Sequence, residues 1–325
     1  MRFRCFFIVA CVCGILALSE SLVLAQSYPS KPVRIIVPFP PGGSTDLTAR
    51  VLGAKLGEAF NQQFIVENRP GASGMIGNDA VARAPADGYL LIMGTIGALS
   101  VNQYLFKKVP YDSLHDFSPI SLTGNVENLL VVHPSLPVHN VKEFIAKAKT
   151  LPGKLIFASS GTGNAPHLAG ELFNQMAHVQ LVHLPYKGGG PAIIDLISGQ
   201  VSLSFSSMPS SLPFVKQAKL RPIGVGGKKR SVAAPDIPTI DESGLAGFEV
   251  TDWQGLLAPA KTPPAVIERL HTESLRALNE TSVKDRLAAA GLQVVTCTPS
   301  QFTDFIRSEI NKWGKVIQAA GIKPE

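Results

Sequence analysis

The sequence predicts an α/β protein with two lobes, each built on a mainly parallel sheet that is covered by helices. Short apolar runs of strand length alternate along the chain with segments of helical spacing, which is the pattern of a helix-covered parallel sheet. Glycine-rich turns join a strand to a helix near Gly42, Gly161 and Gly189. In such sheets ligands bind beyond the carboxyl ends of the strands, so these turns are the first candidates for a site.

The N-terminal residues have the pattern of a secretory leader. Two arginines precede an uncharged apolar stretch from Cys5 to Leu18, and small residues follow up to Ala25. The apolar run is shorter than the roughly 20 residues of a membrane-spanning helix, so the pattern predicts a signal peptide over residues 1–25 with cleavage after Ala25. A lipoprotein signal at Cys11 is the alternative, but hydrophobic sequence continues beyond that cysteine.

The charge and the cysteine count of the chain limit the classes of protein to which it can belong. The 325-residue chain has a formal net charge of +6, and its lysines and arginines are scattered. The run Lys228–Arg230 is interpreted as a solvated loop, so no nucleic-acid partner is expected. Cys297 is the single cysteine outside the leader, so an internal disulfide is not expected and stability must come from apolar burial.

The first lobe is expected over residues 26–124 and 255–325. A strand at Val33–Val37 ends at a proline- and glycine-rich turn, and a helix begins at Ser44 because apolar residues then recur at helical spacing. The pattern next predicts strands at Phe64–Glu67 and Leu90–Met93, with a helix at Met75–Arg83 between them. The stretch 109–121 is expected to be irregular.

The second lobe is expected over residues 125–254. Its predicted strands are Leu129–Val132, Leu155–Ala158, Val179–His183, Val201–Phe205 and Pro222–Val225. Its predicted helices are Val141–Lys149, Pro166–Met176 and Ala192–Ser198. Asn140 and Glu143 form a capping box ahead of the first of these helices.

The C-terminal part of the chain is expected to be helical. Thr262 is interpreted as the cap of one helix, Ser282 as the start of a second, and Thr298–Gln301 as the capping box of a third. An apolar stripe follows the capping box and is expected to pack on the first lobe. The stripe consists of Phe302, Phe305, Ile306, Ile310, Trp313 and Ile317.

The three glycine-rich helix starts are the main candidates for a binding site in this sequence. Amides in the first turn of a helix have no intrahelical partner and lie at the positive end of the helix dipole, so such a turn binds anions. Each turn alone is ordinary loop chemistry. If the three turns face one cleft, they offer neutral donors to a carboxylate from both lobes.

The same stretches carry a family resemblance. The motif PFPPGGSTDLTAR at Pro38–Arg50, with VENRPGASGMIG, APADGYL, GTGNAPHLAGE, LPYKGGGPAIIDLISGQV and WQGLLAPAKTPP, resembles the Bug family, the periplasmic solute-binding receptors of tripartite tricarboxylate transporters. The resemblance implies a two-lobed type II periplasmic binding protein with a cleft between its lobes. It also implies a monomer in the periplasm that closes on a small organic carboxylate and delivers it to membrane permease subunits.

The resemblance and the turns together predict the ligand-binding residues. They are Phe39, Gly42, Gly43, Ser44, Thr45, Asp46, Thr95, Ser159, Ser160, Gly161, Thr162, Asn164, His167, Gly189, Asp195 and Ser206. Asp46 is expected to cap the helix start, and the alternative is that it accepts from the amino group of an amino-acid ligand. His167 either donates to ligand or is structural, and Asp195 either contacts ligand or fixes the packing of its lobe.

One departure from the family pattern concerns the charge of the site. Members of the family commonly carry aspartate where this sequence has Ser202 and Ser206. If Ser206 lies near the pocket mouth, the change removes negative charge and adds a hydroxyl. That change favours a more highly charged or bulkier carboxylate, as a hypothesis by analogy.

Two other function classes compete with a transport receptor. An enzyme would need catalytic machinery, but the sequence has no GxSxG elbow, HExxH motif, paired-cysteine metal spacing or Walker lysine, so no cofactor, metal or catalysis is expected. A sensory receptor that presents solute to a sensor kinase needs the same pair of lobes. The sequence does not separate sensing from transport.

Overall fold

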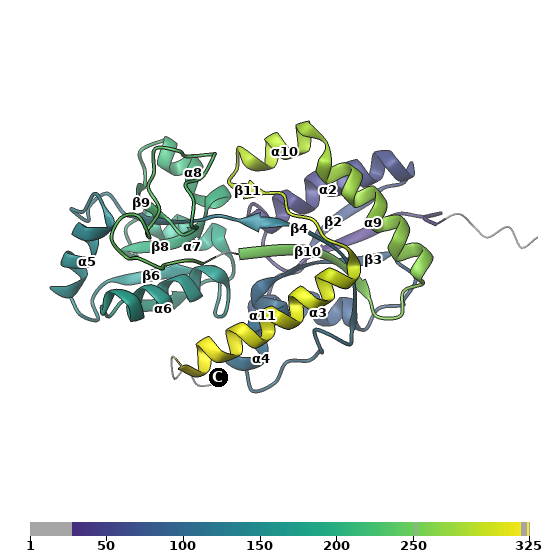
Figure 1. Cartoon of the computed structure of the whole chain (residues 1–325), viewed down its shortest axis with the longest axis horizontal. Coiled ribbons are helices and arrows are strands. Elements are labelled where there is room, and N and C mark those ends of the chain that lie inside the picture. Colours follow the sequence, from purple (N-terminus) through teal and green to yellow (C-terminus); the bar gives the residue numbers. More distant parts are fainter. Residues whose placement is uncertain (1–27, 251, 320–323, 325) are drawn as a thin grey trace, which may run out of the picture. The chain divides into compact units, whose positions relative to one another are not determined.

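The computed structural model describes residues 28–250, 252–319 and 324. The predicted signal peptide lies outside these residues. From Lys31 onward the described chain forms one compact unit that contains two β-sheets (Figure 1). None of its described helices has the length and the apolar character that crossing a membrane requires.

The first sheet combines the early strands of the chain with strands from its C-terminal third. In spatial order it contains β11 (Leu292–Gln293), β4 (Phe117–Val126), β10 (Asp252–Pro259), β3 (Leu90–Thr95), β1 (Val33–Val37) and β2 (Phe64–Asn68). Strand β1 pairs in parallel with β2 and β3, whereas β10 runs antiparallel to both β3 and β4. The long strands β4 and β10 therefore lie side by side, although more than a hundred residues separate them in sequence.

The second sheet is built from the middle of the chain. In spatial order it contains β7 (Val182–Pro185), β6 (Ile156–Ser159), β8 (Leu203–Ser207), β5 (Asn128–Val132) and β9 (Arg221–Val225). Strand β6 is parallel to β7 and β8, and β5 is antiparallel to β8 and β9. In each sheet most strands run in one direction, as predicted: β1, β2, β3 and β4 in the first, and β6, β7, β8 and β9 in the second. The strands β10 and β11 of the first sheet and β5 of the second run the opposite way, so both sheets are mixed.

Helices connect and cover the strands. Around the first sheet they are α2 (Ser44–Phe60), α3 (Met75–Ala82), α4 (Asn102–Leu105), α9 (Pro264–Asn279), α10 (Thr281–Ala288) and α11 (Pro299–Ala319), with a 3₁₀ turn η2 (Ala72–Gly74) and a π-helical turn η3 (Gly97–Val101). Around the second sheet they are α5 (Val141–Lys149), α6 (Ala165–Ala177), α7 (Gly189–Ile197) and α8 (Met208–Lys216). The predicted helices are all present, whereas α4 and α8 are not among those the sequence predicts.

Local capping signals account for several of these boundaries. The Asn140 side chain accepts a hydrogen bond from the Glu143 amide at 2.9 Å, and the Thr298 hydroxyl accepts from the Gln301 amide at 3.2 Å while Gln301 accepts from the Thr298 amide at 3.0 Å. Both capping boxes are thus confirmed. Thr262 is not a cap: its hydroxyl donates to the Pro259 carbonyl, and α9 begins after Pro263.

Two strand predictions need correction. The stretch expected to be irregular contains the start of β4 at Phe117, because this strand is completed by its pairing with the distant β10. The strand expected from Val179 begins only at Val182, where pairing with β6 starts.

The apolar stripe of α11 packs on the first sheet, as predicted. Phe302, Ile306, Trp313 and Ile317 are buried, and the rings of Phe302 and Phe305 lie edge-on to Trp253 of β10. Beneath them the buried Glu309 carboxylate accepts hydrogen bonds from the indoles of Trp253 and Trp313, at 3.1 and 3.0 Å. Helix α11 thereby holds β10 from the face opposite to Asp252 and Gln254, because side chains alternate along a strand.

Candidate functional site

The turn after β1 presents a helix start at the edge of the first sheet. Gly42 has φ +90°, a conformation that favours glycine, and Gly43 is the N-cap of α2 with extended backbone angles. A Cβ atom added at Gly43 would meet nothing within 4 Å. A ligand could therefore approach the backbone closely at this residue. The first-turn amides of α2 have no intrahelical acceptors, and Ser44 and Thr45 lie at this end.

Asp46 is held within its own turn. Its carboxylate accepts from the Gly42 amide at 3.1 Å, from Arg50 at 2.9 and 3.0 Å and from the Asn68 side chain at 3.0 Å. Burial opposes ionisation, but the hydrogen bonds from Arg50, Gly42 and Asn68 outweigh it and lower the pKa of Asp46. Asp46 therefore holds the Gly42 amide just ahead of the helix, and its negative charge is paired with Arg50, whereas the N-cap Gly43 has no side-chain cap hydrogen bond.

The turn after β6 is held by internal hydrogen bonds. The buried Ser159 hydroxyl accepts from the Gly161 amide at 3.2 Å and lies 2.7 Å from Nε2 of His183. Asn164 is the N-cap of α6, and its side-chain amide donates to the Ser160 carbonyl at 3.4 Å. The buried Ser159 side chain therefore stabilises this loop. Ser160 and Asn164 instead line the pocket described below.

His167 belongs to a buried stack of rings. Its centroid lies 4.0 Å from that of His183, which in turn stacks on Phe157 at 4.9 Å. The Nδ1 atom of His167 accepts from the Gly163 amide at 3.1 Å. Burial lowers the pKa of His167 to about 4, and burial together with the neighbouring His167 lowers that of His183 to about 3. Both imidazoles are therefore neutral at pH 7.

The turn after β7 leads into α7. Gly188 has φ +124°, and Gly189 begins the helix. Further along, Asp195 accepts a hydrogen bond from the Tyr186 hydroxyl at 2.7 Å. Burial and this aspartate raise the pKa of Tyr186 to about 12. Asp195 thus ties the helix to the turn that precedes it.

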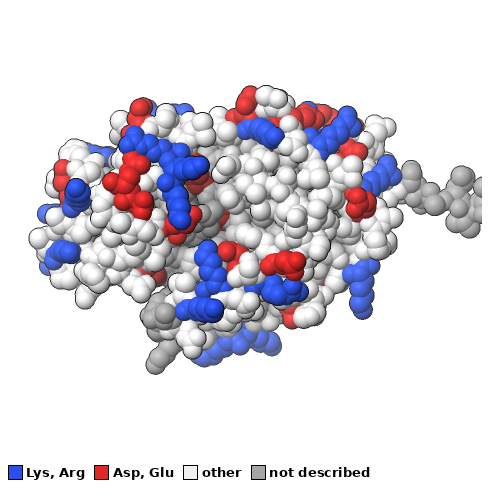
Figure 2. Space-filling model, in the orientation of Figure 1, with Lys and Arg blue, Asp and Glu red and all other residues white. Residues whose placement is uncertain are grey.

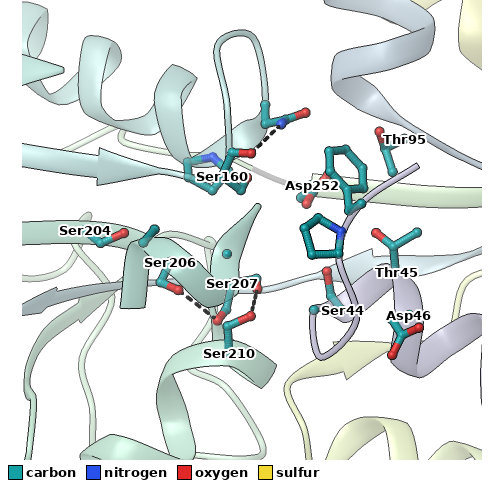
Figure 3. A pocket seen from close by; sticks show the side chains of 17 residues that line it. Ser44, Thr45, Asp46, Thr95, Ser160, Ser204, Ser206, Ser207, Ser210 and Asp252 are labelled. Carbon is teal, nitrogen blue, oxygen red and sulfur yellow. Dashed lines mark hydrogen bonds between the residues drawn. The ribbon is translucent and has the colours of Figure 1, made fainter. Parts of the chain in front are cut away.

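One pocket brings these turns together (Figure 3). It has a volume of about 630 Å³, which includes space open to solvent. The predicted residues that line it are Phe39, Gly43, Ser44, Thr45, Asp46, Thr95, Ser160, Asn164, Gly189 and Ser206. They come from both sheets, so the structure assembles the predicted helix starts around one space.

The remaining predicted residues do not line this pocket. They are Gly42, Ser159, Gly161, Thr162, His167 and Asp195. Gly161 and Thr162 border a neighbouring depression that shares Phe39 and Ser160 with the pocket. Gly42, Ser159, His167 and Asp195 make the internal hydrogen bonds given above and support the turns.

Several lining residues were not predicted. They are Pro40, Pro166, Ala192, Ser204, Ser207, Ser210 and Asp252. Ser207 is the N-cap of α8, and its hydroxyl lies 3.0 Å from that of Ser210 (Figure 3). The serine-rich run after Phe205 is the sequence signal for the lining residues at the start of α8, but the family pattern points only to Ser206 in this run. Nothing local in the sequence marks Asp252, because its place depends on the pairing of β10.

Four helix starts thus reach the pocket, one more than predicted. The N-caps of α2, α6, α7 and α8 are Gly43, Asn164, Gly188 and Ser207. Three of these residues line the pocket themselves, and Gly189 lines it for α7. The positive ends of four helix dipoles make the space favourable to an anion.

The ionisable lining residues are both acidic. Asp46 and Asp252 are the ionisable side chains among the described residues that line the pocket, which include no lysine, arginine or histidine. Burial raises the pKa of Asp252 to about 7, against a hydrogen bond from the Trp253 amide that lowers it. Figure 2 shows that basic and acidic side chains are interspersed on the outer face. The donors that the described lining residues can offer to an anion are therefore uncharged.

In residues 28–250, 252–319 and 324, no group of three or more His, Cys, Asp or Glu side chains is placed to hold a metal ion.

The fold and the pocket define a class of protein. The solved structure of the periplasmic binding protein BugD superposes with a TM-score of 0.87 at 32% identity and covers 92% of this chain and all of that one. The two mixed sheets with a pocket lined from both are those of a type II periplasmic binding protein.

The comparison of sequences then gives the family. The profile of the tripartite tricarboxylate transporter family receptor matches residues 48–322. Protein BugT of Bordetella pertussis is 38% identical over 302 residues, 93% of each chain. This chain belongs to the family of tripartite tricarboxylate transporter receptors, which consists of periplasmic solute-binding proteins.

Two similar structures were solved with organic acids. Rpa4515 of R. palustris with adipate has a TM-score of 0.90 and 36% identity, over 92% of this chain and 100% of that one. MatC (Rpa3494) of Rhodopseudomonas palustris with bound malate has a TM-score of 0.84 and 31% identity, over 89% and 100%. Carboxylate binding is thus recorded for two relatives of similar fold.

Proposed function

We propose that this chain captures a small organic carboxylate outside the cytoplasm and delivers it to the membrane subunits of a tripartite tricarboxylate transporter. The observation that carries the proposal is the convergence of four helix starts on one pocket that has no cationic side chain among its described lining residues. Unpaired amides and hydroxyls at helix starts bind carboxylates without a buried cation. The adipate and malate bound by two relatives support this ligand class.

The binding event is proposed to be a closure of two lobes. Residues 26–124 and 255–325 form one lobe and 125–254 the other, and the chain crosses between them near 123–128 and 251–256. Glu127 separates β4 from β5, and β10 begins at Asp252. A ligand selects the closed form because only this form contacts the helix starts of both lobes at once.

The proposal also covers export of the protein and delivery of its ligand to the membrane subunits. Removal of residues 1–25 after Ala25 releases a monomeric periplasmic receptor, and its closed form is the one that the membrane subunits recognise. Mass spectrometry of the exported protein tests the cleavage site, and an N-terminus other than Gln26 contradicts it. Uptake of labelled ligand into proteoliposomes tests delivery, since transport should require both the receptor and the membrane subunits.

The first experiment measures carboxylate binding directly. The mature chain is titrated by calorimetry with succinate, adipate, malate and citrate, with adipamide as an uncharged control for adipate. Binding to the folded state also raises its unfolding temperature by mass action. The proposal predicts that at least one acid binds and that adipamide does not. If no carboxylate or amino acid binds to protein freed of retained ligand by unfolding and refolding, the proposed function is wrong.

A further inference from the structure

Two residues that line the pocket, and one beside them in the first sheet, carry buried polar atoms without a hydrogen-bond partner among the described residues. The Thr95 hydroxyl, both polar atoms of the Gln254 side chain and Oδ1 of Asp252 are buried and make no hydrogen bond among the described residues. Thr95 is 4% exposed and Gln254 is 1% exposed. Buried polar groups without partners cost free energy, so these atoms point to a missing binding partner.

The strand register brings these side chains together. Gln254 of β10 lies directly opposite Thr95 of β3 in an antiparallel pair, so their side chains project from the same face of the sheet. Asp252 is two residues away from Gln254 and shares that face, because side chains alternate along a strand. Asp252 and Thr95 line the pocket, and Figure 3 shows them on the side of the α2 turn, away from Ser204 and Ser206.

The chemistry of the free atoms favours a donor. An ionised Asp252 can only accept hydrogen bonds, the Gln254 carbonyl oxygen accepts, and the Thr95 hydroxyl can accept. A primary ammonium has three N–H donors, one for each of these three acceptors. Its positive charge complements the negative charge of the Asp252 carboxylate. The amide nitrogen of Gln254 is a donor and remains for a carboxylate oxygen or a water molecule.

Asp46 is not available for this purpose. Its two carboxylate oxygens accept four hydrogen bonds from Arg50, Asn68 and Gly42, and Arg50 neutralises its charge. The carboxylate that sequence analysis considered for a ligand amino group is therefore occupied. Asp252 is the lining carboxylate that has a free oxygen.

We propose that Thr95, Asp252 and Gln254 form an ammonium subsite and that the ligand is an amino acid, with its carboxylate at the helix starts. The inference rests on the proposed function, because the same pocket must bind the carboxylate. The two charges of a zwitterion then meet complementary ends of one pocket: the positive helix starts and the acidic subsite.

The charge around Asp252 makes the pH dependence informative. Asp46, paired with Arg50, is the other ionisable side chain that lines the pocket, and Glu127 follows Val126, the residue of β4 that pairs with Asp252. Burial raises the pKa of Asp252 to about 7, although a hydrogen bond from the Trp253 amide opposes it, and burial also raises the pKa of Glu127. A bound ammonium lowers the pKa of Asp252, so amino-acid binding weakens as pH falls from 8 to 6. A simple dicarboxylate binds more tightly over the same change, because it favours the protonated acid.

The test uses pairs of ligands that differ only in the amino group. L-Aspartate and succinate, L-glutamate and glutarate, and L-2-aminoadipate and adipate are titrated into the mature chain at pH 8. At least one amino acid is expected to bind more than tenfold tighter than its partner acid. In Asp252→Asn that amino acid loses 10- to 100-fold in affinity while the partner acid keeps or gains affinity. Thr95→Val, which removes one acceptor with little change of shape, is expected to lose about threefold or more.

Controls separate the possible failures. Asp285→Asn, an exposed position on α10, makes the same chemical change far along the chain and should leave every affinity unchanged. Urea unfolding verifies that each variant folds. If the dicarboxylates bind wild type and the amino acids do not, or if Asp252→Asn weakens both members of a pair equally, the ammonium subsite is wrong while carboxylate capture stands. If no member of any pair binds, the ammonium subsite is wrong, and the titrations with malate and citrate then decide whether carboxylate capture stands.

Discussion

The substitution Gly43→Asp tests the role of the helix starts with little disturbance of the fold. Gly43 has φ −87° and ψ 176°, which any residue adopts, and a Cβ atom added there meets nothing within 4 Å. Aspartate is also a favoured N-cap residue at the positive end of a helix. We therefore expect the free energy of unfolding to change by less than about 1 kcal/mol.

The effect of Gly43→Asp on binding is expected to be large. Two negative charges about 5 Å apart, at an effective dielectric constant of about 20, repel by about 3 kcal/mol. This energy corresponds to a loss of roughly 100-fold or more in affinity for a carboxylate, because each 1.4 kcal/mol is about tenfold. Calorimetric titration measures the affinity, and urea unfolding measures the stability of the same samples.

Matched variants isolate the charge in the pocket. Gly43→Asn has nearly the same size without a charge and is expected to lose much less affinity. Thr281→Asp places a new carboxylate at the exposed start of α10 and should not change binding. The reasoning is refuted if Gly43→Asp binds within threefold of wild type, or if Gly43→Asn loses as much affinity as Gly43→Asp.

Three further predictions concern stability. The pKa values of His167 and His183, about 4 and about 3, lie below the ordinary value of about 6.5, so the unfolded chain binds protons first. Stability should fall as pH drops below about 6.5, by up to about 1.4 kcal/mol per pH unit for each histidine, as seen in urea unfolding at several pH values. Glu309→Ala removes the acceptor shared by two buried indoles and should cost about 2–4 kcal/mol in the same assay. Gly42→Ala places a side chain at φ +90° and should cost about 1–2 kcal/mol, whereas Gly43→Ala should be nearly neutral.

Each stability prediction has an outcome that contradicts it. His167→Gln should reduce the dependence of unfolding on pH below 6.5, and an unchanged slope means that this histidine does not titrate as described. Glu309→Gln keeps one acceptor oxygen and should lie between wild type and alanine. Equal losses for Gly42→Ala and Gly43→Ala would show that the backbone angle at Gly42 is not the cause.

Proline, glycine and helix-capping residues are sufficient to predict many of the helix and strand boundaries. The strand Val33–Val37 and the helix Val141–Lys149 have both predicted ends, and helix α2 has its predicted start at Ser44. Proline, glycine and capping residues act over a few positions, so their effect can be seen in sequence alone. For the same reason the helix starts that reach the pocket from α2, α6 and α7 were predicted.

Tertiary structure decided what depends on distant pairing. Strand β10 lies between β3 and β4, and only this register places Asp252 and Gln254 beside Thr95. From the sequence, Asp46 is expected to cap the helix start or, alternatively, to accept from a ligand amino group, but in the folded chain its carboxylate is occupied by Arg50 and Asn68. A residue type shows which hydrogen bonds a side chain can make. Its neighbours in the folded chain determine which of them remain free for a ligand.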